Sequence, residues 1–381
     1  MQVYLDHAAT APMRPESLAA MLPCLTEHFG NPSGSHAVAR RARMAVDDAR
    51  DDVARCLGCE PGELVFTSGG TESDNLAVLG AHGSGRGTVM CSAVEHHAVR
   101  NTCEALGATI VPVHRSGLVD LDALAGVLGP EVGLVSVMLV NNEVGTVQPL
   151  AEVAALVREL APGALLHTDA VAAVGWLDVA ALGAVADLVS VSAHKFGGPK
   201  GVGALVVRDR VRLAPVMYGG AQERGRRPGT HDVAGIVGMA AALRVATADR
   251  EDAVGRVGRL RDRLVDGLTA SIDGVQETAP HTGAEGARHR SAKVAYSCHL
   301  RVAGVDQEEL LMLLDDQGVC ASAGAACASG AVEASHVLLA MGFDADEART
   351  AVRFALGYTT TGDDIDHVLD VMPKVVERLR A

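Results

Sequence analysis

The sequence predicts an α/β protein in which helices pack on a sheet of buried strands. Short apolar runs alternate with helical stretches between residues 63 and 207, which is typical of repeated βα units. Hydrophobic residues make up 48% of the 381 residues, but aromatic residues make up only 3%. The core therefore consists mainly of Ala, Val and Leu side chains, which favour closely packed helices on a sheet. The chain is long enough for two domains.

The charge and the N-terminus exclude several classes of protein. The formal net charge is -14 and the pI is about 5.5, which argues against general affinity for nucleic-acid backbones or anionic lipid. The N-terminus shows no basic segment followed by an apolar one, and no apolar run is long enough to span a bilayer. We expect a cytoplasmic protein that does not bind membranes or nucleic acid directly.

The eight cysteines lack the dense, regular spacing of a secreted disulfide scaffold. We expect most of them to be reduced core residues. Cys56 and Cys59 form a lone Cys-x-x-Cys pair, which is either a redox pair, half of a zinc site, or two unrelated thiols at a helix end. With no second pair in the sequence, we favour the last interpretation.

Two helices are predicted near the N-terminus, over residues 15–29 and 38–57. An irregular lead-in over residues 6–12 precedes them. The loop between the helices, residues 30–36, is rich in Gly, Asn, Pro and Ser. It is either an ordinary turn or part of a pocket lined by small polar groups.

Residues 63–76 predict a strand, a Ser/Gly turn and the start of a helix. Amides at a helix N-terminus bind phosphate, and glycine lets phosphate oxygens approach the backbone. The turn lacks both the Gly-Lys-Ser/Thr ending of a Walker A loop and the Gly-x-Gly-x-x-Gly dinucleotide pattern. A single phosphate on Gly70 and Thr71 fits better, while a purely steric role for the glycines stays open.

Polar residues end the strands that follow. His96 opens a helix after a strand over residues 87–92, and either caps that helix or lies flat on an aromatic ring. Asn142 follows the buried strand 134–140, and Asp169 ends the strand that begins at residue 165. A carboxylate at Asp169 would pair with a protonated pyridine nitrogen and keep a pyridoxal ring electron-withdrawing, or would cap a helix.

Lys195 is the residue around which these strand ends are arranged. It follows the buried strand 186–191 and precedes a glycine-rich turn, so it lies at the sheet edge where α/β proteins place their chemistry. Removal from water favours the neutral amine, which attacks a carbonyl to form a Schiff base. The strand ends thus supply a phosphate cradle, an imidazole, an acid and a lysine.

The chain changes character after a last strand over residues 203–207. The basic, glycine-rich loop 219–230 is either solvated or binds an anion. An alanine-rich helix from Asp232 and a charged helix over 249–268 mark the expected domain boundary. Beyond them the sequence predicts a loop, a strand and a helix, over residues 277–291, 293–298 and 306–317 respectively.

Two residues near the C-terminus carry candidate chemistry. Cys327 lies among small residues, in a setting typical of an accessible, reactive thiol. Arg353 is predicted to lie within a helix, where its guanidinium either clamps a carboxylate or forms a surface ion pair.

Six motifs occur in one order along nearly the whole chain. They are residues 5–10 (Leu-Asp-His-Ala-Ala-Thr), 29–33 (Phe-Gly-Asn-Pro-Ser), 66–75 (Phe-Thr-Ser-Gly-Gly-Thr-Glu-Ser-Asp-Asn), 140–145 (Val-Asn-Asn-Glu-Val-Gly), 194–195 (His-Lys) and 227–230 (Arg-Pro-Gly-Thr). Together they closely resemble the cysteine desulfurases, pyridoxal-phosphate enzymes of the class V aminotransferase family. Residues 327–342 are similar to the long-loop branch, which contains the bacterial housekeeping and nitrogen-fixation enzymes.

The resemblance implies a fold and a domain division. The fold is that of fold-type I pyridoxal-phosphate transferases: a large domain with a mixed, mostly parallel seven-stranded sheet flanked by helices, and a smaller α+β domain. Residues 15–255 would form the large, cofactor-binding domain. Residues 1–14 and 256–381 would form the small domain, which carries the catalytic cysteine loop.

The resemblance also implies roles for individual residues. Lys195, Cys327 and His96 would be catalytic: Lys195 would bond the cofactor aldehyde and move the substrate α-proton, and Cys327 would attack the substrate sulfur. Asn31, Asn142 and Arg353 would orient the cysteine substrate. The residues expected to bind pyridoxal 5'-phosphate are Gly70, Thr71, His96, Asn142, Asp169, Ser192, His194, Lys195 and, from the other subunit, Thr230. No resident metal is expected, and Cys327 is the one residue that would ligate an iron–sulfur cluster transiently.

The implied reaction converts L-cysteine into L-alanine and leaves a persulfide on Cys327. A homodimer would pass this sulfur to an iron–sulfur scaffold protein or to a tRNA-thiolating enzyme. Two alternatives are a selenocysteine lyase or other class V aminotransferase, for which Cys327 would be dispensable, and a non-catalytic sulfur-carrier or scaffold protein.

The sequence departs from the family pattern at three positions. Where many relatives have Asp-Ala-x-Gln, this chain has Ala172 in place of the Gln, so the amide that usually donates to the 3'-oxygen of the cofactor is missing. Our hypothesis is that its loss makes that oxygen more basic. Ala193 and Ala325 replace the more frequent Gly and Ser, which are sterically mild changes.

Overall fold

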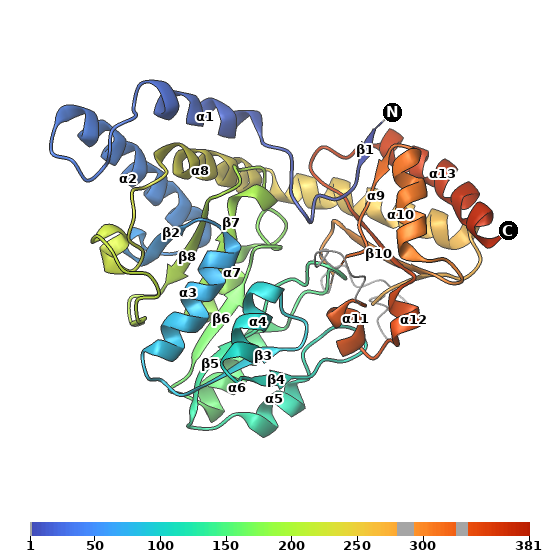
Figure 1. Cartoon of the computed structure of the whole chain (residues 1–381), viewed down its shortest axis with the longest axis horizontal. Coiled ribbons are helices and arrows are strands. Elements are labelled where there is room, and N and C mark those ends of the chain that lie inside the picture. The colour runs from blue at the N-terminus through green and yellow to red at the C-terminus, as the bar shows by residue number, and fades with distance from the viewer. Residues whose placement is uncertain (1, 280–292, 325–333) are drawn as a thin grey trace.

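The structure is a computed structural model that describes residues 2–279, 293–324 and 334–381, and its centre is a seven-stranded sheet (Figure 1). The strand order is β2-β8-β7-β6-β5-β3-β4. All neighbours from β7 to β4 are parallel, whereas β8 is antiparallel to β7 and to β2. The strands are β2 (Leu64–Thr67), β3 (Thr88–Ser92), β4 (Thr109–Val111), β5 (Val132–Ser136), β6 (Leu165–Asp169), β7 (Leu188–Ser192) and β8 (Gly203–Val207). The predicted mixed, mostly parallel sheet is confirmed.

Helices cover both faces of this sheet, because successive residues of a buried strand point to opposite sides. On β7, Leu188 belongs to the core that includes α3 and α4, whereas Val189 belongs to the core that includes α2, α6 and α8. Figure 1 shows α3 and α4 in front of the sheet. The helices in this part of the chain are α1 (Pro15–Thr26), α2 (Ala37–Leu57), α3 (Gly70–Gly83), α4 (His97–Ala105), α5 (Leu121–Val127), α6 (Leu150–Leu160), α7 (Val179–Leu182) and α8 (Val233–Ala248).

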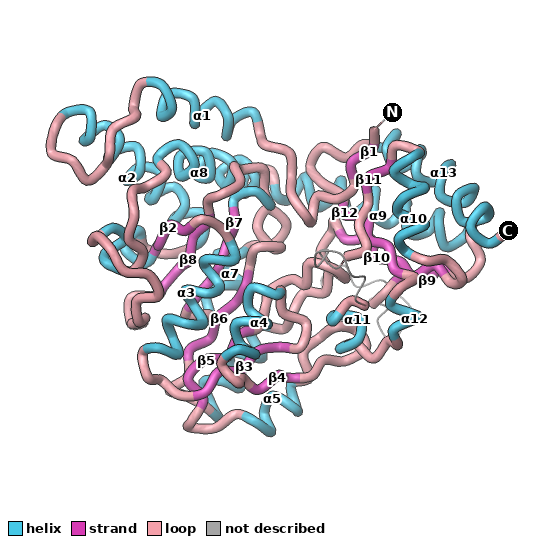
Figure 2. The backbone as a smooth tube through the Cα atoms, viewed as in Figure 1, coloured by secondary structure: helices cyan, strands magenta, loops and turns pink. Residues whose placement is uncertain are grey.

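A second group of elements contains two small sheets (Figure 2). Strands β12 (Ala351–Ala355), β10 (Ser297–Val302) and β9 (Val275–Glu277) form an antiparallel sheet in that order. Strand β1 (Val3–Tyr4) pairs in parallel with β11 (Val319–Cys320), so the N-terminus lies among C-terminal elements. The helices of this group are α9 (Arg250–Ser271), α10 (Gln307–Asp316), α11 (His336–Ala340), α12 (Ala345–Ala348) and α13 (Gly362–Arg380).

The structure corrects two predicted elements. Arg353 lies in strand β12 and not in a helix. The five residues of β12 are all buried, and a short buried apolar run cannot be assigned to a helix or a strand from its periodicity alone. The strand predicted over residues 293–298 begins only at Ser297; Lys293 forms an isolated bridge with Thr146 instead. The predicted loop over residues 277–291 lies mostly outside the described residues.

The predicted N-terminal helices are confirmed, although α1 ends at Thr26 instead of residue 29. Cys56 and Cys59 lie at the C-terminal end of α2, as expected. Burial raises the pKa of Cys56 and raises that of Cys59 to about 12, which opposes thiolate formation. In the part of the chain that the structure describes, no helix combines the length and the hydropathy needed to cross a bilayer.

Candidate active site

A cavity of ≈ 450 Å³ lies at the carboxyl ends of the parallel strands. This is the edge at which open α/β sheets bind ligands. The predicted residues that line it are Gly70, Thr71, His96, Asn142, Asp169, Ser192, His194, Lys195 and Arg353. The structure thus gathers in one place side chains that are separated by more than two hundred positions in the sequence.

Lys195 enters this cavity from a short 3₁₀ turn, Ala193–Lys195, that directly follows β7. Its Nζ donates to the backbone oxygen of Ala8. The pKa of Lys195 is lowered to about 8, mainly by burial and further by the positive charge of Arg353. A substantial neutral fraction of this amine is therefore present near physiological pH, as a nucleophilic lysine requires.

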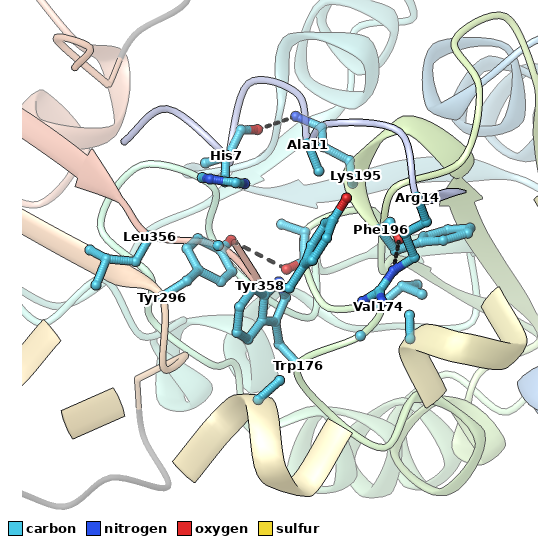
Figure 3. Close-up of a pocket in the computed structure, with 16 residues that line it drawn as sticks. His7, Ala11, Arg14, Val174, Trp176, Lys195, Phe196, Tyr296, Leu356 and Tyr358 are labelled. Atoms are coloured by element: carbon cyan, nitrogen blue, oxygen red, sulfur yellow. Dashed lines mark hydrogen bonds between the residues drawn. The ribbon is translucent and has the colours of Figure 1, made fainter. Parts of the chain in front are cut away.

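Aromatic residues lie beside Lys195. A second, much smaller cavity of ≈ 30 Å³ lies beside Lys195, and Figure 3 shows the rings of Trp176, Tyr296 and Tyr358 around it. Trp176 and Tyr296 pack with their ring centroids 5.2 Å apart. Tyr296 Oη also donates to the backbone oxygen of Ala172 at 3.2 Å. Lys195 and Ala172 line both cavities, so the aromatic wall forms one side of the site.

Asp169 ends β6, the strand next to β7. Its Oδ1 accepts a hydrogen bond from the amide of Val171 at 2.8 Å. Burial raises the pKa of Asp169 to about 6, although that hydrogen bond and the charge of Lys195 act in the opposite direction. No α-helix starts directly after Asp169, so the carboxyl does not serve as the helix N-cap that the sequence left open. It faces the cavity.

The turn between β2 and α3 forms a cradle for an anion. Helix α3 begins at Gly70, and Gly69 has φ 148°, a conformation that favours glycine. A Cβ atom at Gly70 would come within 2.8 Å of a methyl group of Val171, so only glycine leaves this approach open. Ser192 and His194 line the same cavity, and His194 is neutral because burial lowers its pKa to about 4.

His96 has the first of the two roles that the sequence left open, that of a helix cap, and it also faces the cavity. It is the N-cap of α4, and its Nδ1 accepts from the amide of Ala98 at 3.1 Å. Its ring also lines the cavity. Burial, aided by the charge of Lys195, lowers the pKa of His96 to about 4, so the ring is a neutral imidazole. A neutral, planar ring suits packing against another aromatic ring.

Arg353 is buried at the cavity wall and held by three oxygens. Nη2 donates to Asp6, and Nη1 donates to the backbone oxygens of Asn142 and Gly324. Its Nε has no hydrogen-bond partner among the described residues. Both Nη atoms are thus bonded to protein oxygens, and the positive charge of the guanidinium at the cavity wall favours an anionic group such as a carboxylate.

Two of the predicted residues that the structure describes do not line this cavity. Asn31 and Thr230 are exposed and do not line it. Cys327 lies outside the described residues, while Gly324, the last described residue before it, lines the cavity.

Sequence reasoning missed Asp6, Ala8, Asp74 and Met138, which also line the cavity. A signal for Asp74 was available: it lies four positions after Gly70 and three after Thr71, so it shares their face of a helix.

The donor set fits pyridoxal phosphate: a helix N-terminus with glycines for the phosphate, a buried acid for the ring nitrogen, a neutral imidazole for the ring face and a lysine with a lowered pKa for the aldehyde.

Comparisons with known proteins agree with this geometry. A sequence model described as "Aminotransferase class-V" matches residues 3–368. The chain is 40% identical to "Cysteine desulfurase IscS" of Methanosarcina thermophila, covering 99% of this chain and 93% of that protein. It is 43% identical to "IscS-like cysteine desulfurase" of Mycobacterium tuberculosis, covering 99% and 97%. A solved structure, "NIFS-LIKE PROTEIN", matches with a TM-score of 0.89 and 32% identity, covering 99% and 100%.

Proposed function

Because this chain belongs to the aminotransferase class-V family and is a pyridoxal-phosphate-dependent cysteine desulfurase, we propose that the cavity at the strand ends is where L-cysteine is bound and desulfurated. The observation that carries this proposal is the shared cavity of Lys195 and Asp169, an amine and an acid whose charges act on each other.

Each of these cavity residues would hold a different part of the cofactor. Lys195 would bond its aldehyde, Asp169 would pair with its ring nitrogen and His96 would pack against its ring. The residues that hold the phosphate and complete the site are Gly70, Thr71, Ser192, His194 and Asn142. When bound, pyridoxal phosphate withdraws electrons from the substrate and so weakens its bond to the α-proton.

Arg353 and Asn142 orient the substrate. The positive charge of the Arg353 guanidinium at the cavity wall favours the α-carboxylate of cysteine. When it is not bonded to the cofactor, the Nζ of Lys195 would act as a base inside the cavity. The lowered pKa of Lys195 keeps a usable fraction of this amine neutral, so that Nζ accepts the α-proton and returns it later. Asn31 completes the substrate contacts.

Cys327 takes the sulfur. Its thiolate attacks the substrate sulfur, so an S–S bond forms as the C–S bond breaks. The electron pair of the broken bond stays on the substrate carbon, which gains a proton and leaves as alanine. The products are L-alanine and a persulfide on Cys327, and the electrons balance without an external oxidant.

The active form is a homodimer, in which Thr230 of one subunit reaches the phosphate of the other. Thr230 is exposed and does not line the cavity of its own chain. Helix α1 and the residues that follow it present Leu18, Leu22, Leu25 and Phe29, which are 51% to 72% exposed. Such an exposed apolar row is typical of a protein interface. Light scattering of the purified protein measures this directly, and a monomer would contradict the proposal.

The elements fall into the two expected domains, residues 15–255 and residues 1–14 with 256–381. In support, all seven strands of the central sheet lie between residues 64 and 207, and β1 pairs with β11. We also propose a cytoplasmic location, because the seven described cysteines are free thiols. The sulfur acceptor is an iron–sulfur scaffold protein or a tRNA-thiolating enzyme.

Mass spectrometry after incubation with cysteine tests the central assignment. We expect one persulfide, on Cys327, together with stoichiometric alanine; a persulfide on another thiol would overturn it. In Cys327→Ala, sulfide release should be lost. Persistent sulfide release would instead favour a selenocysteine lyase type of enzyme, an alternative that the named relatives do not support.

A further inference from the structure

A second buried carboxyl lies beside Asp169 and has no role in the function proposed above. Asp74, on α3, is 1% exposed and lines the same cavity. Its Oδ1 is 3.6 Å from Nε2 of His167 and, among the described residues, has no hydrogen-bond partner. The hydroxyl of Ser190 interacts with the same carboxyl.

Asp74 lies at one end of a chain of buried polar side chains. Ser190 Oγ is 3.0 Å from Nε2 of His167, and Nδ1 of His167 is 2.8 Å from Ser136 Oγ. Burial lowers the pKa of His167 to about 3, so this imidazole is neutral. The contact between His167 and Asp74 is therefore not an ion pair. This row of hydrogen-bonded side chains, from Asp74 to Ser136, contains no cation.

Two other buried carboxyls of this protein have a different environment. Asp187 is 2% exposed and lies 2.6 Å from a guanidinium nitrogen of Arg210. Glu223 is 8% exposed and lies 2.5 Å from a guanidinium nitrogen of Arg50. Asp74 forms no ion pair with Lys or Arg in the part of the chain described by the structure. A buried carboxylate without a cation is costly, so the carboxyl neutralises instead.

The charged groups that face Asp74 favour the same outcome. Its neighbours on other elements are Asp169 at the end of β6 and Glu95 after β3, which are both acids. Burial first, and the charge of Asp169 second, raise the pKa of Asp74 well above its ordinary value. Lys195 acts on Asp169, whose ionised form it stabilises.

We propose that Asp74 is a positioning residue that stays a neutral carboxylic acid and donates a hydrogen bond to Ser190. Of the two neighbouring carboxyls, Asp169 is then the one that ionises. The proposal rests on the role of Asp169 given above. Two neighbouring carboxyls in a dry site do not both ionise readily, and their environments separate their proton affinities.

The hydrogen bonds between these hydroxyl and imidazole groups then all run in one donor-to-acceptor direction. Asp74 donates to Ser190, Ser190 donates to Nε2 of His167, and Nδ1–H of His167 donates to Ser136. Hydrogen bonds alone allow the opposite direction, in which Ser190 donates to an ionised Asp74. The surrounding charges decide between the two, since the opposite direction would place two carboxylates side by side.

Infrared spectroscopy of the full-length protein tests the proposal, because a protonated carboxyl has a C=O stretching band that an ionised carboxylate lacks. At about pH 8, far above the ordinary pKa of Asp, we expect Asp74→Asn to remove one such band. Asp169→Asn should leave that band in place, because burial, the larger cause of the raised Asp74 pKa, remains. Glu95→Gln should remove a different band. Loss of the same band in Asp169→Asn, and its retention in Asp74→Asn, would reverse the assignment and overturn the proposal.

Ser190→Ala provides a second variant in case Asp74→Asn fails to fold. It removes the acceptor of the proposed hydrogen bond, so the Asp74 band should shift; an unshifted band would contradict the proposed donation. These infrared results do not require that the cofactor be bound as proposed, so they fail or succeed independently of the proposed function.

The absorbance of the bound cofactor, titrated against pH, tests the positioning role. Asp74→Ala opens the wall to water and should move the midpoint of this titration, whereas Asp74→Asn, which keeps a neutral donor, should restore it. An unmoved midpoint in Asp74→Ala, or one that Asp74→Asn does not restore, would show that Asp74 does not act through Asp169.

Discussion

Nη2 of Arg353 donates to Oδ1 of Asp6 at 2.7 Å, although the two residues are 347 positions apart. This ion pair joins strand β12 to the segment that follows β1. It fixes the guanidinium at the cavity wall, where its charge contributes to the lowered pKa of Lys195. Arg353 therefore lowers the pKa of Lys195, in addition to the contact with the substrate that we propose for Arg353.

Arg353→Gln should make Lys195 harder to deprotonate. Only the neutral amine attacks the aldehyde, so incorporation of the cofactor into cofactor-free protein should accelerate as the pH rises through about 8. Loss of the neighbouring positive charge should move this midpoint to higher pH, by up to about one unit. Arg349→Gln, which changes an exposed arginine, is the matched control. A midpoint that stays in place, or that moves to lower pH, would contradict the assigned influence of Arg353.

Lys195→Ala should abolish turnover. The variant lacks the amine that we propose bonds the cofactor and accepts the α-proton, so alanine formation from cysteine should fall by about 10³-fold or more. Lys200→Ala alters an exposed lysine five residues further along the chain and should keep its rate. If Lys195→Ala formed alanine within about tenfold of the unmodified protein, another base would have to be sought.

Ala172→Gln tests the departure from the family pattern. Ala172 lines the cofactor cavity, and a Gln amide there would donate to the 3'-oxygen of the cofactor and make it less basic. The pH midpoint of the cofactor absorbance should therefore fall. Ala172→Leu fills similar space without a donor and should not lower the midpoint. Equal shifts in both variants would attribute the effect to volume and not to hydrogen bonding.

Glu223→Gln should destabilise the protein in a pH-dependent way. Burial would raise the pKa of Glu223, but hydrogen bonds from His231 and Arg50 outweigh it and lower the pKa to about 2. A carboxyl with a lowered folded-state pKa stabilises the fold above its unfolded-state value of 4.5, and this stabilisation is lost as the pH falls towards about 2.

The free energy of unfolding should thus drop by about 3 kcal/mol at neutral pH, because Arg50 loses its buried partner. The deficit should shrink below about pH 4.5. Glu104→Gln, which removes a half-exposed partner of Arg100, should cost only about 0.5 kcal/mol. Denaturant unfolding at several pH values measures both variants, and a deficit that does not depend on pH would rule out the ionised pair as its cause.

The sequence predicted much of the site because of how parallel strands are arranged. Gly70, Asp169 and Lys195 each follow a recognisable buried strand, and the carboxyl ends of parallel strands meet at one edge of a sheet. The residues of the small sheet were harder to assign. Arg353 lies in a short run whose pattern suits a helix as well as a strand, and only its pairing with His299 on β10 settles its conformation.

By itself the sequence determined the order of strands and turns, because periodicity and turn chemistry are short-range properties. That order also determined which polar residues would lie at the sheet edge. The tertiary structure decided which of these groups carry charge. The opposite environments of Asp74 and Glu223 illustrate this: both are buried acids, but one faces other acids and neutral groups while the other meets Arg50. Burial and neighbouring charges set proton affinity, and these depend on segments that are distant in the chain and that meet only when it folds.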